Sequence, residues 1–202
     1  MPVWFRQVLY ALMLLLCALV GLRVYLETMG PAPSSSVTTG AADSEQLTET
    51  LPTFTLNDSF GEPRSIDEWA GKPLLINFWG TWCAPCLREM PLLQALHSSQ
   101  DDLQVIGIAI DRQDDVQRFM SENGITYPSL VGEADAIAVS EVFGVDALGL
   151  PFTVLVSSEG NILSVFIGEF GLQELETMAS TMRELEAGGI NLARAREQLE
   201  AL

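Results

Sequence analysis

Two cysteines, Cys83 and Cys86, lie where a strand pattern changes directly into a helix pattern. Residues 73–79 (PLLINFW) are almost continuously apolar, which is typical of a strand buried on both faces of a sheet. In residues 84–98 the apolar side chains recur every three or four positions, which predicts a helix with one apolar face. A strand that passes straight into a helix indicates an α/β fold with both cysteines at the junction.

Strand and helix patterns continue to alternate after this junction. Residues 103–110 predict a second buried strand, and residues 114–124 and 172–188 predict helices. Alternating elements of this kind predict a mixed, mostly parallel central sheet flanked by helices. We also expect an extra N-terminal hairpin over residues 53–66 and an antiparallel hairpin at the sheet edge over residues 152–168.

Residues 1–29 are predicted to form a membrane anchor. Residues 8–22 carry no charge, and with the flanking apolar residues they approach the ~20 needed to cross the hydrocarbon. A cleaved signal peptide is one alternative, but no convincing small-residue cleavage site follows the apolar run. A lipoprotein acylated at Cys17 is the other, but bulky Leu16 precedes that cysteine. We expect an uncleaved signal anchor, a single transmembrane helix with Arg6 on the cytoplasmic side.

The rest of the chain divides into three parts. Residues 30–50 are small and polar, which is typical of a flexible linker. The globular domain is expected over residues 51–187. Residues 188–202 predict a C-terminal helical tail, either a surface helix or frayed end, or a helix that binds a partner. The net charge of −17 excludes nucleic acid as a partner, because phosphates require a basic surface.

Three kinds of chemistry are open to a cysteine pair at this spacing. A structural zinc site needs four ligands, and the domain adds only His97, which lies too far along the helix, so we expect no metal. A structural disulfide gains stability from a long loop, and this loop is very short. Redox exchange fits best. Backbone N–H groups at the helix start favour a Cys83 thiolate, and Cys86 is placed to resolve the mixed disulfide.

The wider sequence supports this interpretation through a resemblance. FWGTWCAPC, residues 78–86, resembles the active site of thioredoxin-fold proteins. Residues 51–96 are similar to membrane-anchored, extracytoplasmic thiol:disulfide oxidoreductases of the TlpA/ResA/CcmG (DsbE) type, and the similarity extends to about Ala187. It implies a thioredoxin-like fold whose redox centre is the Cys83–Cys86 disulfide, with no other cofactor. It also implies a single-pass protein of the inner (cytoplasmic) membrane, with the domain on the periplasmic side.

The resemblance assigns roles around the cysteines. It implies that Cys83 attacks and Cys86 resolves. Trp82 corresponds to the aromatic residue beside the disulfide. Pro151 corresponds to the cis-proline that, with the backbone of Leu150, docks an extended substrate; a trans bond in an ordinary loop is the alternative.

Supporting roles follow for the strand and the helix. Asn77 stands where soluble thioredoxins carry a buried aspartate, and it cannot accept a proton. Glu89 matches an acidic residue of the anchored reductases and shares a helix face with Cys86, so it is expected to help take the proton from that thiol, unless it is simply an exposed carboxylate. Three residues complete the helix: Ala84 between the cysteines, Pro85 in the first turn, where no backbone N–H is needed, and the helix-kinking Pro91.

The sequence also favours one direction of electron flow. A helix N-terminus stabilises a thiolate by only about 0.3–1 kcal/mol, which is less than one pKa unit. Arg88 is the one cation between Asn77 and Pro91, and Glu89 opposes it. Cys83 is therefore not expected to be strongly acidic, and because the strong oxidants of this fold depend on an acidic thiolate, we predict a reductant.

Partners are implied by the same resemblance. The expected substrates are proteins with cysteine pairs, above all the C-x-x-C-H cysteines of apocytochrome c during cytochrome c maturation. Copper-site assembly proteins, or periplasmic proteins in general, are the alternative. A membrane protein that relays electrons from the cytoplasm is the expected donor. A different class of function, a redox-inert peptide-binding or chaperone-like module, stays open for this fold.

Overall fold

The computed structural model describes Leu19, Arg23 and residues 49–99, 102–146 and 149–202. Almost all of the predicted anchor and of the predicted linker lies outside these residues. Within the described residues, no helix combines the length and the apolar character needed to cross a bilayer.

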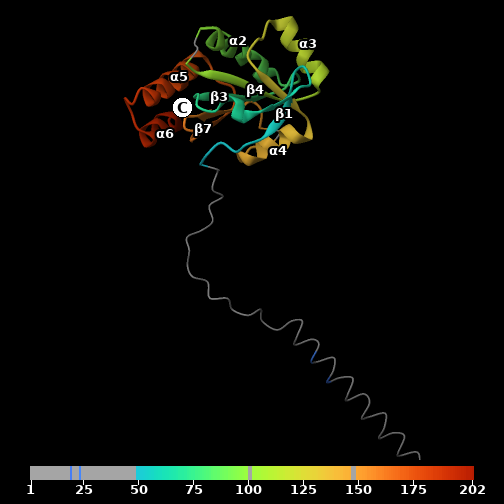
Figure 1. Ribbon diagram of the computed structural model, residues 1–202, viewed down its shortest axis with the longest axis horizontal. Helices are drawn as coiled ribbons and strands as arrows, with labels where there is room; N and C mark the ends of the chain where they lie inside the picture. Colours follow the sequence, from blue (N-terminus) through green and yellow to red (C-terminus); the bar gives the residue numbers. More distant parts are fainter. Residues whose placement is uncertain (1–18, 20–22, 24–48, 100–101, 147–148) are drawn as a thin grey trace, which may run out of the picture. The chain divides into compact units, whose positions relative to one another are not determined.

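In the described part of the chain, seven strands form one sheet in the order β2-β1-β5-β4-β3-β6-β7. Figure 1 shows helices on both sides of the strands. The strands are β1 (Thr55–Asp58), β2 (Pro63–Ser65), β3 (Leu74–Trp79), β4 (Gln104–Ile110), β5 (Ser129–Gly132), β6 (Phe152–Val156) and β7 (Ile162–Ile167). The helices are the 3-10 helix η1 (Ile66–Trp69) and the α-helices α2 (Ala84–Ser99), α3 (Gln113–Asn123), α4 (Ala134–Val142), α5 (Leu172–Glu186) and α6 (Leu192–Glu200).

The sheet is mixed, but the expectation that it is mostly parallel is wrong. Among the described strands, only β3–β4 and β4–β5 pair in parallel, because α2 and α3 each carry the chain back to the same end of the sheet. The predicted hairpins β1–β2 and β6–β7 are antiparallel, as are the pairs β1–β5 and β3–β6. Phe152 pairs with Phe78, so the chain enters β6 at the end of the sheet where β3 finishes and then runs against β3.

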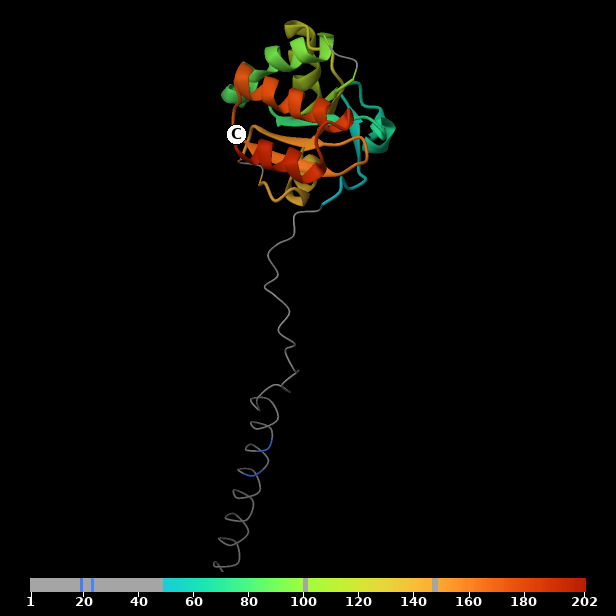
Figure 2. The ribbon, with the colours of Figure 1, turned by 90° about the vertical axis from the view of Figure 1, so that its left-hand side faces the viewer.

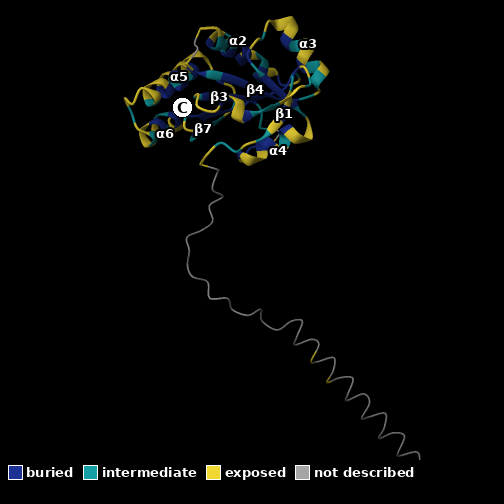
Figure 3. Ribbon diagram, in the orientation of Figure 1, coloured by how far each residue is buried: buried dark blue, intermediate teal, exposed yellow. Residues whose placement is uncertain are grey.

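Helices cover both faces of the sheet, and successive residues of β3 point to opposite faces. Leu75 and Trp79 belong to a core cluster shared with α2, α3 and α5. Ile76 and Phe78 belong to a second cluster shared with η1 and α4. Figure 3 shows the buried strands enclosed between helices whose outer surfaces are exposed. This two-sided burial explains the nearly continuous apolar sequence of β3.

The C-terminal helix α6 is part of this domain. It packs against α5 and β7, and Figure 2 shows α5 and α6 side by side. Ala195 and Leu199 are buried, and the Arg196 guanidinium donates from Nε (3.1 Å) and Nη2 (2.8 Å) to the carbonyl of Ile162 on β7. Among the described residues, 188–202 belong to the same compact unit as the rest of the domain, and so the predicted tail is part of it.

Candidate active site

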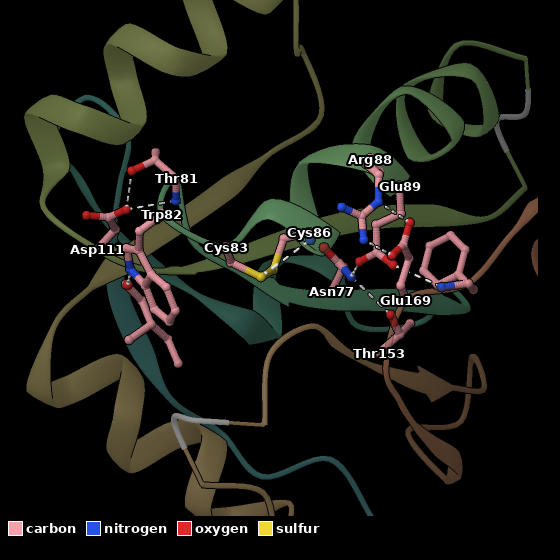
Figure 4. Close-up of a disulfide and its surroundings, with 12 residues drawn as sticks. Asn77, Thr81, Trp82, Cys83, Cys86, Arg88, Glu89, Asp111, Thr153 and Glu169 are labelled. Atoms are coloured by element: carbon pink, nitrogen blue, oxygen red, sulfur yellow. Dashed lines mark hydrogen bonds and ion pairs between the residues drawn. A yellow bond between two sulfur atoms is a disulfide. The ribbon is translucent and has the colours of Figure 1, made fainter.

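The two cysteines are joined by a disulfide at the carboxyl end of β3 (Figure 4). β3 ends at Trp79, and α2 begins at Ala84, so Cys83 immediately precedes the helix and Cys86 lies in its first turn. The Cα atoms of the two cysteines are 5.3 Å apart. The predicted strand–cysteine–helix junction is therefore confirmed.

The two cysteines are both buried, but not to the same extent. Cys83 is 5% exposed, whereas Cys86 is completely buried. The backbone N–H of Cys86 donates to Cys83 Sγ at 3.4 Å, which is a contact that favours negative charge on the Cys83 sulfur. An incoming thiol or disulfide can thus meet Cys83 and not Cys86.

Asp111, which directly follows β4, holds the loop that leads into the disulfide. Its Oδ2 accepts hydrogen bonds from the backbone N–H (2.8 Å) and the hydroxyl (2.6 Å) of Thr81, and its Oδ1 accepts from the N–H of Arg112 at 2.8 Å. Beside it, Trp82 Nε1 donates to the carbonyl of Ile110 at 3.2 Å. The Trp82 residue is still 59% exposed, so it presents an anchored aromatic ring next to Cys83 (Figure 4).

Replacing Asp111 by alanine is expected to lower the free energy of unfolding by about 2 kcal/mol, because the half-buried Thr81 loses its charged acceptor. Denaturant unfolding with the disulfide intact measures this change. Asp114→Ala, an exposed aspartate nearby on α3, is the matched control and should cost less than about 1 kcal/mol. Equal losses in the two variants would contradict the assigned anchoring role.

A cluster of buried polar side chains lies between α2 and the sheet. Asn77 and Glu89 are 0% and 1% exposed. Asn77 Nδ2 donates to Glu89 Oε1 at 2.7 Å and to Thr153 Oγ1 at 3.1 Å, and the backbone N–H of Phe170 donates to Glu89 Oε2 at 3.2 Å (Figure 4). Glu89 is therefore not the exposed helix carboxylate that the sequence left open as an alternative.

Burial changes the acidity of Glu89. The loss of water around the carboxyl raises its pKa from 4.5 to about 7, although the hydrogen bonds from Asn77 and Phe170 act in the opposite direction. A carboxyl group with a pKa near neutrality can both accept and release a proton at physiological pH. The Asn77 amide carries a donor and an acceptor, so a rotation of that amide allows it to bond either form of Glu89.

Two of the predicted substrate-docking residues, Leu150 and Pro151, immediately precede β6, the strand that pairs with β3. The Leu150–Pro151 peptide bond is cis, as expected. The Pro151 carbonyl accepts a hydrogen bond from the N–H of Gly168 at 2.8 Å, and the pairing of Phe152 with Phe78 places this segment beside the end of β3. Leu150 is half-buried and packs against both core clusters.

The three supporting helix residues lie where the sequence placed them. Ala84 is exposed at the first position of α2, and Pro85 follows it in the first turn. Pro91 lies inside α2, where its ring removes a backbone donor from the helix. In the described part of the chain, no group of three or more His, Cys, Asp or Glu residues is placed to hold a metal ion.

Sequence reasoning missed three residues that build this site. Asp111 could have been noticed as a polar residue that ends a buried strand, and Thr153 as a polar residue within the apolar run FTVLV. Phe170 takes part through its backbone N–H, which no residue type would reveal. Asp111 bonds the loop before the cysteine helix, Thr153 bonds Asn77 on β3, and Phe170 bonds Glu89 on α2.

Comparisons with known proteins agree with this geometry. A family model described as Redoxin matches residues 46–180. The thiol-disulfide oxidoreductase ResA of Geobacillus kaustophilus is 26% identical over 169 residues, which cover 82% of this chain and 89% of that protein. ResA of Halalkalibacterium halodurans is 33% identical over 126 residues, which cover 61% of this chain and 69% of the relative.

Solved structures give the same result. A DsbF homologue from Corynebacterium diphtheriae has a TM-score of 0.59 and 27% identity, with 74% of this chain and 96% of that chain covered. A secreted thiol-disulfide isomerase from Corynebacterium glutamicum has a TM-score of 0.58 and 26% identity, with 64% and 82% covered. The predicted thioredoxin-like fold is thereby confirmed. The chain belongs to the redoxin family and is a thiol:disulfide oxidoreductase.

Proposed function

We propose that this protein reduces cysteine pairs of other proteins outside the cytoplasm. The observation that carries the proposal is the unequal exposure of the two cysteines, since Cys83 keeps a small exposed surface and Cys86 has none. The Cys83 thiolate attacks one sulfur of the substrate disulfide, forming a mixed disulfide and releasing the first substrate thiolate. The Cys86 thiolate then attacks Cys83 Sγ, which releases the second substrate thiolate and forms the Cys83–Cys86 disulfide. Two electrons pass to the substrate.

Glu89 serves the second step. Cys86 is fully buried, so its thiol needs a proton acceptor within the protein before it can attack. Glu89 lies three residues further along α2 and on the same helix face, with a pKa of about 7. It takes the Cys86 proton, and it is available to return a proton when the disulfide is reduced again.

The surroundings of Cys83 favour the reducing direction. A strong oxidant stabilises its thiolate with nearby positive charge. Here Arg88 forms an ion pair with Glu169, and its side chain is 61% exposed. The Glu169 carboxylate and the solvent therefore weaken the electrostatic effect of the Arg88 charge on Cys83.

The surface around Cys83 is where we expect substrates to bind. We assign the docking of an extended cysteine-containing segment to the exposed Trp82 ring and the backbone of Leu150 and Pro151. Apocytochrome c with its C-x-x-C-H cysteines is the substrate we favour, because the sequence resemblance implies it. The N-terminal 29 residues would anchor the protein in the inner membrane with the domain on the periplasmic side. A tethered membrane donor of electrons could then re-reduce the disulfide at high effective concentration.

Equilibration of the full chain with glutathione buffers tests the direction of electron flow. A reductant should have a reduction potential below about −200 mV, whereas a potential near −120 mV, typical of periplasmic oxidants, would contradict the proposal. A Cys86→Ser variant tests the substrate class. It should form a stable Cys83-linked complex with an oxidised C-x-x-C-H peptide, and the same peptide with both cysteines replaced by serine is the control.

A further inference from the structure

A short segment between β7 and α5 crosses the buried carboxyl of Glu89. We call residues 168–171 the strap. Adjacent residues of α2 hold adjacent residues of this segment, because Arg88 bonds Glu169 and Glu89 bonds the N–H of Phe170 (Figure 4). The strap is therefore fastened to α2 at two neighbouring points, one on the surface and one in the core.

The surface fastening has the geometry of a positioning contact. Arg88 Nε donates to Glu169 Oε1 at 2.8 Å, and Arg88 Nη2 donates to Glu169 Oε2. Two parallel bonds from a planar guanidinium fix orientation as well as distance. The side chains of Arg88 and Glu169 are 61% and 34% exposed, so the pair contributes little to global stability. Its effect is local to the strap.

The core fastening excludes water from Glu89. Phe170 is 2% exposed and packs in the cluster that contains both cysteines. Its ring also meets Phe166 edge to face, with the centroids 6.4 Å apart. Gly168 has a φ of 109°, a conformation that favours glycine, and its N–H bonds the carbonyl of Pro151. The strap thus links the cis-proline segment to Glu89.

We propose that Arg88 and Glu169 are positioning residues. Their ion pair holds the strap against α2, which excludes water from the Glu89 carboxyl and preserves its hydrogen bond with the Phe170 amide. The consequence for cysteine chemistry rests on the proposed role of Glu89 as the proton acceptor of Cys86. The strap's effect on Glu89 itself is independent of that role.

A test must separate the effect of the strap on Glu89 from the effects of the charged and titratable groups around it. Glu169 on the strap raises the pKa of Glu89 through like charge. Arg88, on the same helix, neutralises Glu169. Tyr127, which precedes β5, has a raised pKa owing to burial and to the Glu89 charge, so its hydroxyl stays neutral. Asn77 and Thr153 do not titrate, and Cys86 is held in the disulfide.

Two single variants distinguish positioning from simple charge effects. Glu169→Gln and Arg88→Gln both release the strap. Loss of the Phe170 N–H bond by itself raises the Glu89 pKa, but burial is the larger cause of its shift, so the entry of water should lower the pKa by about half a unit in both variants. Charge alone predicts opposite shifts, because Arg88→Gln leaves Glu169 unneutralised and would raise the pKa. The exchanged double variant, Arg88→Glu with Glu169→Arg, should return the pKa to the wild-type value. Glu197→Gln, which breaks the exposed pair with Arg194 on α6, should leave it unchanged.

Carboxyl carbon NMR of Glu89 in the oxidised full chain measures these pKa values directly. Amide hydrogen exchange at Phe170 is the second readout, and protection there should fall several-fold in both single variants. Opposite pKa shifts, or unchanged Phe170 protection, would overturn the positioning role.

The pH dependence of disulfide exchange separates this inference from the proposed function. If the Glu89 pKa measured by NMR falls in the two single variants, and the midpoint of the pH profile of the exchange rate falls with it, the strap inference and the proton-accepting role of Glu89 both stand. If the NMR pKa falls while the rate profile stays fixed, the strap inference stands and the proton-accepting role of Glu89 fails.

Discussion

Replacing Cys83 by serine is expected to abolish disulfide reduction, with turnover falling by more than about 1,000-fold. Cys83 is the cysteine with solvent access, and a serine hydroxyl cannot form a disulfide with a substrate. The fold should be preserved, because serine is close to cysteine in size. Reduction of a peptide disulfide, with excess dithiol to regenerate the enzyme, measures the loss.

Cys86→Ser is the matched control for this prediction. It should also stop turnover, but it should still carry out the first attack and accumulate a mixed disulfide through Cys83. Mass spectrometry of the protein after incubation with the peptide distinguishes the two variants. A mixed disulfide in Cys83→Ser, or measurable turnover, would show that Cys86 is reached directly and would refute the order of attack.

Replacing Glu89 by glutamine is expected to remove a large pH dependence of stability. The pKa of Glu89 in the folded state, about 7, lies above its ordinary value of 4.5, so the folded state binds this proton more tightly than the unfolded state. Stability from this group is fully present below pH 4.5 and is lost as the pH rises towards 7, by about 3 kcal/mol in total. Glutamine has no proton to lose.

Denaturant unfolding between pH 4 and pH 8 measures this effect, with the disulfide intact. The difference between the wild-type and Glu89→Gln curves isolates Glu89 from every other titrating group. The exposed Glu176→Gln on α5 is the control and should follow the wild type. Resolution of a Cys83 mixed disulfide should slow by about 100-fold in Glu89→Gln at neutral pH, the usual size of a general-base contribution. Parallel stability curves for wild type and Glu89→Gln would show that burial does not perturb this carboxyl.

The parts of the site that follow from local sequence were predictable. The cysteine spacing, the buried strand before it and the helix after it lie within one continuous stretch. Gly124 was expected to end a helix, and it caps α3 in the left-handed conformation with a φ of 66°. Pro151 and Glu89 were found because a motif resemblance pointed to them.

The contacts that complete the site could not be predicted in this way. Thr81 meets Asp111 across 30 positions, Asn77 meets Thr153 across 76, and Glu89 meets Phe170 across 81. Such contacts depend on which strands are neighbours and on their register. Strand direction was misjudged for the same reason, because the alternation of elements does not reveal at which end of the sheet β6 begins.

The hydrogen bonds from Arg196 to the carbonyl of Ile162 have a consequence for the behaviour of the whole chain. β7 is the last strand of the sheet, and an open outer strand can serve as a template for a strand of another molecule. Here a guanidinium from the chain's own last helix occupies this acceptor. Helix α6 thus closes part of the outer border of the sheet, next to the bridge between Thr50 and Asn161, and leaves one acceptor fewer for a strand of another molecule.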